Sequence, residues 1–120
     1  MVARRARVWP AGPRYTRRMA TPKLEAGEVT RRLAEIAGWT LENGKLHREY
    51  RFGDFVEAFG FMASVALVAE RMNHHPEWFN VWSTVRVDLT THDAGGISAK
   101  DFELAAAMER IVGATRAQTK

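Results

Sequence analysis

The sequence predicts an α+β protein, in which an antiparallel sheet of three to four strands carries three helices packed on one face. Three observations support this fold class. The expected elements follow the order α-β-β-α-β-β-α, so that strands and helices do not alternate one by one. An Asn-Gly pair between two alternating runs indicates an antiparallel hairpin. With 120 residues, of which 46% are hydrophobic and 27% charged, the chain suits one compact domain.

The first helix is predicted over residues 24–37. Its apolar side chains Val29, Leu33 and Ile36 recur at the spacing of one helix face. Gly38 follows, and glycine is the usual residue just past the end of a helix. We therefore expect the helix to end there and the chain to turn into the sheet.

A β-hairpin is predicted over residues 39–52. Asn43 and Gly44 stand between two runs of alternating apolar and polar residues. Both central residues of a type I′ turn need a positive φ, which Asn and Gly tolerate best. After the turn, Leu46 and Tyr50 share one face of the second strand, so this face is expected to be buried.

The central helix is predicted to begin after Asp54, a favourable N-cap, and to end near Met72. Its apolar side chains cover most of the circumference instead of one stripe, which is typical of a helix buried on more than one side. In a domain this small, the second side is expected to be a subunit interface. The sequence therefore predicts a homodimer or homotetramer that assembles through residues 54–72 or through a sheet edge.

The last third of the chain predicts strands followed by a helix. Residues 78–91 are rich in β-formers and alternate in polarity near their end, and a Gly-Gly turn follows at 95–96. Ser98 and Asp101, three residues apart, resemble a capping box at the start of the final helix.

Charge divides the chain into two parts. Residues 1–22 contain six arginines, no acidic residue and three of the four prolines, and they are predicted to form a disordered extension. Three uses of this extension stay open: a transit peptide, an arm that binds nucleic acid, or a solvated segment. Residues 23–120 are predicted to form the single domain. Its 12 basic and 14 acidic side chains argue against nucleic-acid binding by the domain itself.

The cellular setting is also constrained by composition. The absence of cysteine excludes disulfides and thiolate metal sites, and it fits a cytoplasmic location. No run of 18 apolar residues occurs, so no membrane-spanning segment is expected.

Three histidines are the main candidates for chemistry. His74 and His75 lie at the end of the predicted central helix, and His92 lies at the end of the last strand. Imidazole exchanges protons near neutral pH, so three rings at one rim would suit acid/base catalysis. Structural roles stay open as well, because a helix end favours imidazolium. Adjacent residues point in different directions, so no metal site is predicted.

Several neighbouring residues have both structural and functional interpretations. Glu70 could orient an imidazole or face solvent, and Asn73 could end the helix or bind a ligand. Trp78 and Trp82 could stack on a flat ligand or pack in the core. His47 lies on the polar face of the hairpin, where a structural or solvated role is expected.

These residues together resemble a known family. The run from Glu70 to Pro76, followed at fixed spacings by Trp82, His92 and Asp101, is similar to the signature of the pterin-4a-carbinolamine dehydratases. The resemblance extends from about Gly38 to Val112. It implies dehydration of 4a-hydroxytetrahydropterin to quinonoid dihydropterin in tetrahydrobiopterin recycling, without a metal or other cofactor. An aromatic amino-acid hydroxylase would be the partner enzyme in that pathway.

The resemblance also implies the site residues. The catalytic set would be His74, His75 and His92, with His75 mainly a substrate binder, while Glu70 and Trp39 are further candidates. The pterin site would be lined by Asn73, His74, His75, Thr90, Thr91, His92 and Asp93. This chain has Asn73 where some members have Asp, and Trp82 where Tyr is frequent. Animal members of the family stabilise the dimer of a transcription factor, which supplies a non-enzymatic alternative.

Overall fold

The computed structural model describes residues 21–118. The elements are α2 (Ala26–Leu33), β1 (Thr40–Glu42), β2 (Lys45–Arg51), α3 (Phe55–Met72), β3 (Glu77–Val81), β4 (Thr84–Leu89), the short 3-10 helix η2 (His92–Ala94) and α4 (Ala99–Gln118). This order confirms the predicted α+β class. The extension expected over residues 1–22 lies outside the described residues except for its last two.

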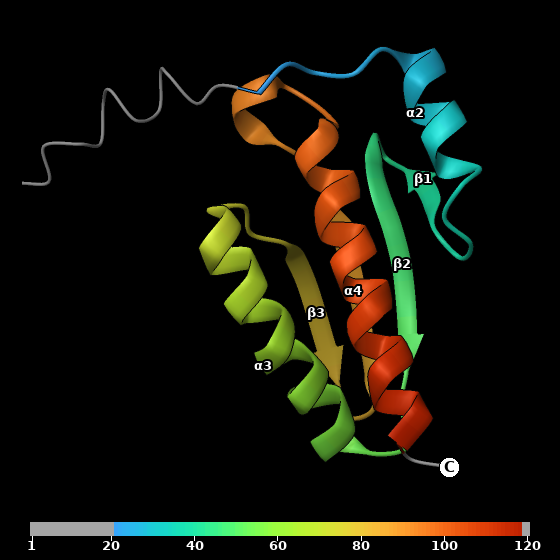
Figure 1. Ribbon diagram of the computed structural model, residues 1–120, viewed down its shortest axis with the longest axis vertical. Helices are drawn as coiled ribbons and strands as arrows, with labels where there is room; N and C mark the ends of the chain where they lie inside the picture. The colour runs from blue at the N-terminus through green and yellow to red at the C-terminus, as the bar shows by residue number, and fades with distance from the viewer. Residues whose placement is uncertain (1–20, 119–120) are drawn as a thin grey trace, which may run out of the picture.

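All strand pairs of the sheet are antiparallel, in the order β1-β2-β4-β3. α3 connects β2 to β3, and β4 then returns between them. In Figure 1, α3 and α4 lie side by side over one face of the sheet, while α2 lies at the β1 edge beside the start of α4. This arrangement brings the end of α3, the start of β3 and the loop after β4 to the end of the sheet where α4 begins.

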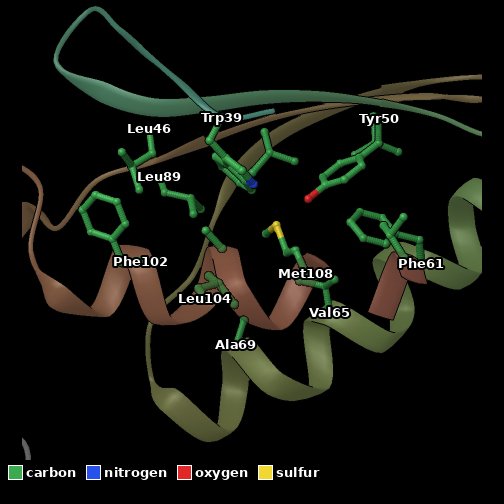
Figure 2. Packing of buried hydrophobic residues seen from close by; sticks show 14 of the residues in the cluster. Trp39, Leu46, Tyr50, Phe61, Val65, Ala69, Leu89, Phe102, Leu104 and Met108 are labelled. Atoms are coloured by element: carbon green, nitrogen blue, oxygen red, sulfur yellow. The ribbon is translucent and has the colours of Figure 1, made fainter. Parts of the chain in front are cut away.

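The hydrophobic core fills the space between the sheet and the two long helices (Figure 2). Leu46, Val85, Val87 and Leu89 contribute fully buried side chains from the strands, and Leu104 and Met108 contribute them from α4. Tyr50 packs its ring against Phe61 with 4.8 Å between ring centroids. Burial of this apolar surface supplies the main stabilisation of the fold.

Local sequence signals determine most element boundaries. Asn43 and Gly44 have φ of 53° and 77°, which confirms the predicted hairpin turn. The side chain of Asp54 accepts a hydrogen bond of 2.9 Å from the backbone N–H of Glu57, which confirms the predicted cap of α3. Asn73, in the left-handed conformation, ends the same helix.

The first helix is shorter than predicted, because it covers Ala26–Leu33 instead of 24–37. At its start, the backbone N–H of Leu24 donates to the carbonyl of Ile97, which draws residues 23–24 alongside the loop before α4. At its end, backbone bonds from Glu35 and Ile36 reach back only three residues, so the chain tightens into turns.

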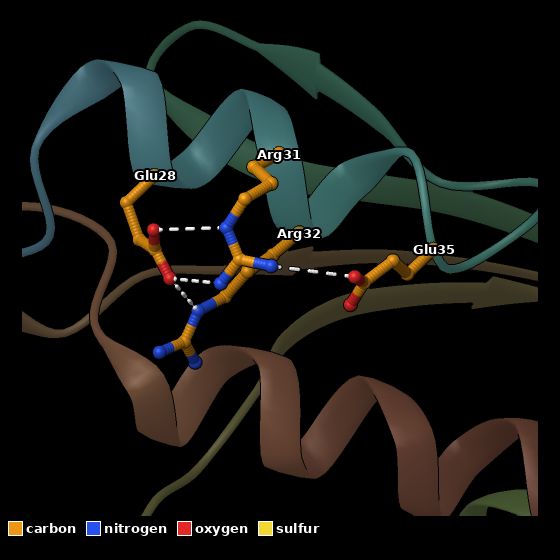
Figure 3. A network of polar contacts seen from close by, with 4 residues as sticks. All are labelled: Glu28, Arg31, Arg32 and Glu35. Carbon is orange, nitrogen blue, oxygen red and sulfur yellow. Dashed lines mark hydrogen bonds and ion pairs between the residues drawn. The ribbon is translucent and has the colours of Figure 1, made fainter.

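Charged side chains form a network along α2 (Figure 3). Glu28 accepts hydrogen bonds from Arg31 and Arg32, and these bonds lower the pKa of its carboxyl to about 2. The Arg32 guanidinium also lies 5.8 Å from the ring centroid of Phe102, which connects α2 to α4.

α3 leaves an apolar side uncovered. Phe55, Val56, Phe59 and Leu67 are between 48% and 76% exposed, although each is a large hydrophobic residue. The opposite face of the same helix packs in the core. Within residues 21–118, no helix has both the length and the apolar character needed to cross a membrane.

Candidate active site

His74 is held at the junction of α3 and the following loop. The left-handed backbone of Asn73 turns the chain, and the N–H of His74 donates to the carbonyl of Ala69. The His74 side chain is buried, and its Nε2 lies 2.6 Å from Oδ1 of Asp101. Asp101, at the start of α4, has no exposed surface. A buried carboxylate is stable when its oxygens are fully hydrogen-bonded.

The other oxygen of Asp101 completes this set of bonds. Oδ2 accepts a hydrogen bond of 2.9 Å from the backbone N–H of Ser98 and one of 2.7 Å from the hydroxyl of Thr91. The Ser98 hydroxyl accepts from the N–H of Lys100, and the Asp101 carboxylate accepts from the N–H of Ser98, so the two side chains cap the start of α4 as predicted. Because Asp101 engages Nε2 of His74, Nδ1 is the ring nitrogen on the side away from this carboxylate.

His75 lies in a different environment from its neighbour. Its side chain is 58% exposed, and its Nε2 lies 2.8 Å from Oε1 of Glu70 in the last turn of α3. Glu70 was expected either to orient an imidazole or to face solvent, and it does both, since its side chain is 81% exposed.

His92 opens the 3-10 helix after β4, and its side chain is 82% exposed. Its Nε2 lies 3.3 Å from Oε2 of Glu77, the first residue of β3. The other oxygen of Glu77 accepts a hydrogen bond of 2.6 Å from Nζ of Lys45. This bond lowers the pKa of the Glu77 carboxyl, so the carboxylate is ionised at neutral pH.

Two short connections join the segments that carry His74 and His92. Thr91 binds Asp101, which binds His74, and His92 contacts Glu77, three residues after His74. Each of the three predicted histidines thus has its own carboxylate partner.

Sequence reasoning missed Glu77 and the role of Asp101 as a partner of His74. The fixed spacing of Asp101 in the resemblance was the one signal that could have indicated it.

The remaining candidates occupy three kinds of position. Asn73 and Asp93 are exposed, Thr90 is half-buried, and Thr91 is buried with its hydroxyl bound to Asp101 and Ser98.

Trp39 is a core residue whose Nε1–H donates to Glu109. Trp78 packs against the core, whereas Trp82 is 67% exposed at the turn between β3 and β4. His47 pairs with Asp88 on the outer face of the sheet, as a structural role requires.

Two further features bear on ligands. Among residues 21–118, no group of three or more histidine and carboxylate side chains is arranged to hold a metal ion. A cavity of 620 Å³ lies elsewhere, between the start of α2, the hairpin turn and the loop at 95–97, and none of the histidines lines it. The three histidines are therefore separate from this cavity.

The fold and the site together define a small α+β protein with imidazole–carboxylate pairs, which are the groups of general acid/base catalysis. Residues 22–111 match the family profile described as pterin 4 alpha carbinolamine dehydratase. The chain therefore belongs to the pterin-4a-carbinolamine dehydratase family, whose members are named for a hydro-lyase reaction.

Individual relatives agree with this membership. A protein of Solibacter usitatus is 60% identical over 91 residues, which are 76% of this chain and 96% of that protein. One of Rhizobium johnstonii is 51% identical over 94 residues, covering 77% and 93%. Both are provisionally named pterin-4-alpha-carbinolamine dehydratase. A crystal structure of a transcriptional coactivator/pterin dehydratase from Brucella melitensis has a TM-score of 0.72 and 41% identity, and covers 74% of this chain and 97% of its own.

Proposed function

We propose that this protein dehydrates 4a-hydroxytetrahydropterin to quinonoid dihydropterin. The carbon–oxygen bond at C4a breaks, the hydroxyl leaves as water after accepting a proton, and a ring nitrogen gives up its proton. Both proton transfers need a group that titrates near neutral pH, which imidazole provides. The observation that carries the proposal is the buried His74–Asp101 pair, connected through Thr91 to the segment of His92.

In this proposal His74 and His92 exchange protons with the substrate. The buried Asp101 fixes the ring orientation of His74 and stabilises the imidazolium that forms when Nδ1 accepts a proton. His92 reaches the substrate from the exposed loop after β4, so the two rings act from different elements. Donors on different sides of a flat ring would serve both stereoisomers at C4a.

The other residues of the site bind the substrate or position the acid/base pair. His75, Asn73, Thr90 and Asp93 keep polar groups at or near the surface, where they can bind the edge of a pterin. Thr91 has a different part in this proposal. Its hydroxyl is buried against Asp101 and Ser98, so it positions the acid/base pair instead of touching the substrate.

A stopped-flow assay with freshly generated 4a-hydroxytetrahydropterin tests the proposal. The wild-type protein should accelerate the appearance of the quinonoid absorbance, and the rate should saturate with substrate. A rate equal to that of buffer alone, at every protein concentration, would contradict the activity. In the cell, we place the protein in the cytoplasm, where an aromatic amino-acid hydroxylase would supply this substrate.

We also propose that the protein self-associates through α3. The exposed residues Phe55, Val56, Phe59 and Leu67 form an apolar surface that a second copy of the chain would cover. The same surface suits the alternative, a dimer-stabilising partner of a transcription factor. The name of the Brucella melitensis protein, which includes transcriptional coactivator, is the observation that favours it. If the isolated protein dehydrates the pterin, it is an enzyme, and the purely non-enzymatic alternative is excluded.

A further inference from the structure

We infer that Glu77, anchored by Lys45, is a positioning residue for His92. The inference deepens the proposed function, because it assumes that His92 exchanges a proton with the substrate. The resemblance described above gives neither Glu77 nor Lys45 a role in the site. Glu77 is held by two elements of the sheet, His92 is largely exposed, and the two side chains are in contact.

Glu77 is held from two directions. Its backbone is the first residue of β3 and pairs with Asp88 of β4, and the preceding Pro76 restricts the chain that leads into the strand. Its carboxylate accepts the hydrogen bond of 2.6 Å from Lys45. Lys45 is the first residue of β2, two strands away in the sheet, so its side chain reaches across β4 to Glu77. The sheet therefore fixes the backbone of Glu77, and Lys45 restricts its side chain.

His92 has few constraints of its own. Its side chain is 82% exposed, and within residues 21–118 the ring makes no polar contact with a side chain other than Glu77. A free ring would sample several rotamers, and ordering it costs conformational entropy. Catalytic geometry, however, requires the reacting group to be held within about 0.5 Å. Glu77, 3.3 Å from Nε2, provides the missing constraint.

The charge of Glu77 adds to this effect. An ionised carboxylate beside the ring stabilises the imidazolium that forms when His92 accepts a proton. The hydrogen bond from Lys45 is the largest cause of the lowered pKa of Glu77 and favours its ionised form. The contact with His92 lowers the same pKa further, so the titration of Glu77 reports whether the contact exists in solution.

The first arm of the test needs no turnover. The carboxyl carbon of Glu77 is titrated by NMR in the wild type, in His92→Gln and in Lys45→Met. We expect the pKa of Glu77 to rise in both variants, and more in Lys45→Met. An unchanged pKa in His92→Gln would overturn the inference, because Glu77 and His92 would then not interact.

The second arm measures kinetics in a double-mutant cycle. Glu77→Gln should lower kcat on the order of 10-fold with little change in KM, as loss of an orienting contact does. In the His92→Gln background, the same substitution should have no further effect on kcat. An equal loss in both backgrounds would show that Glu77 acts elsewhere, and it would refute the positioning role.

The matched control is Glu49→Gln. Glu49 is a carboxylate on the same outer face of the sheet, but it pairs with Arg51 at 2.7 Å. Its substitution should leave kcat and the Glu77 titration unchanged. If the wild type has no dehydratase activity, the proposed function fails, and the positioning role of Glu77 in catalysis fails with it. If the wild type is active and the titration shows that Glu77 and His92 interact, but Glu77→Gln keeps the wild-type kcat, then the positioning role of Glu77 is rejected and the proposed function stands.

Discussion

The Nε2 atom of His74 lies 2.6 Å from Oδ1 of Asp101, and this contact joins the end of α3 to the start of α4. Asp101 is fully buried and also accepts hydrogen bonds from Thr91 and Ser98. One carboxylate thus caps a helix, holds the loop after β4 and orients an imidazole. Stability and the proposed chemistry therefore depend on the same side chain.

Asp101→Asn should reduce both activity and stability. The amide has one acceptor oxygen and no charge, so it cannot serve all three donors or stabilise an imidazolium. We expect kcat to fall about 100-fold and the free energy of unfolding to fall by about 1–3 kcal/mol, as for a buried hydrogen-bonded group that loses a partner. Denaturant unfolding and stopped-flow kinetics measure the two effects. Ser98→Ala, which keeps the His74–Asp101 contact, should retain most of the activity, and equal losses in both variants would contradict the assignment.

Gly38→Ala should destabilise the protein. Gly38 has φ of 91°, and a Cβ at this position would lie 1.5 Å from Nη1 of Arg48, which donates to the carbonyl of Ala37. We expect a loss of about 2 kcal/mol from the strained backbone and the displaced arginine. Thermal or chemical unfolding measures it.

Gly27→Ala is the control for that substitution. Gly27 lies inside α2 and has no atom within 4 Å of an added Cβ. Alanine should therefore stabilise the helix by up to about 1 kcal/mol. Equal stability changes at the two glycines would show that the conformation of Gly38 is not required.

Tyr50 should make stability decline at high pH. Burial, together with the hydrogen bond from its hydroxyl to Glu109, raises the pKa of Tyr50 well above its usual value. Above about pH 10, the unfolded chain therefore releases a proton that the folded chain keeps. Stability is complete below that pH and is lost as the pH rises above it.

The comparison that isolates this effect is Tyr50→Phe, which removes the titrating group. At neutral pH the variant should be less stable by about 1 kcal/mol, because one hydrogen bond is lost. Above about pH 10, the difference between wild type and variant should shrink. Urea unfolding over a pH series measures both curves, and curves that stay parallel would refute the explanation.

Leu67→Glu should reduce self-association. Leu67 is 72% exposed on α3, so a charge there would be buried in the proposed contact but solvated in the free chain. Light scattering should give the wild type a molar mass that is a multiple of 13.6 kDa. The variant should have a smaller molar mass and an unchanged far-UV spectrum. Leu41→Glu, at an exposed leucine of the edge strand β1, is the control. Dissociation by Leu41→Glu instead would place the interface at the sheet edge.

Much of the fold could be predicted because its signals are local. Asn43 and Gly44 predict their turn from backbone preference, and Asp54 and Ser98 predict helix starts from side chains that bond within three residues. The start of the first helix could not be predicted in this way. It depends on tertiary contacts such as the one between Leu24 and Ile97, which are far apart in the sequence.

The same distinction between local and long-range signals applies to the candidate site. The histidines could be identified from residue type and spacing, because imidazole has a distinctive pKa. Their partners could not, since Glu77 of β3 meets His92 in the segment after β4, and Asp101 of α4 meets His74 at the end of α3. Thr91 shows the limit most clearly. It was expected to bind the substrate, yet its hydroxyl is buried against Asp101.

The most direct test of the account is the rate of water loss from 4a-hydroxytetrahydropterin in His74→Ala, His92→Ala and the double variant. His47→Ala is the matched control, because the His47 side chain pairs with Asp88 and, among the described residues, contacts none of the other three histidines. We expect the dehydration rate of each single variant to fall by about 100-fold or more. The rate of His47→Ala should stay near that of the wild type, and all far-UV spectra should remain native. A folded double variant that turns over at the wild-type rate would contradict the claim that these two imidazoles expel the hydroxyl.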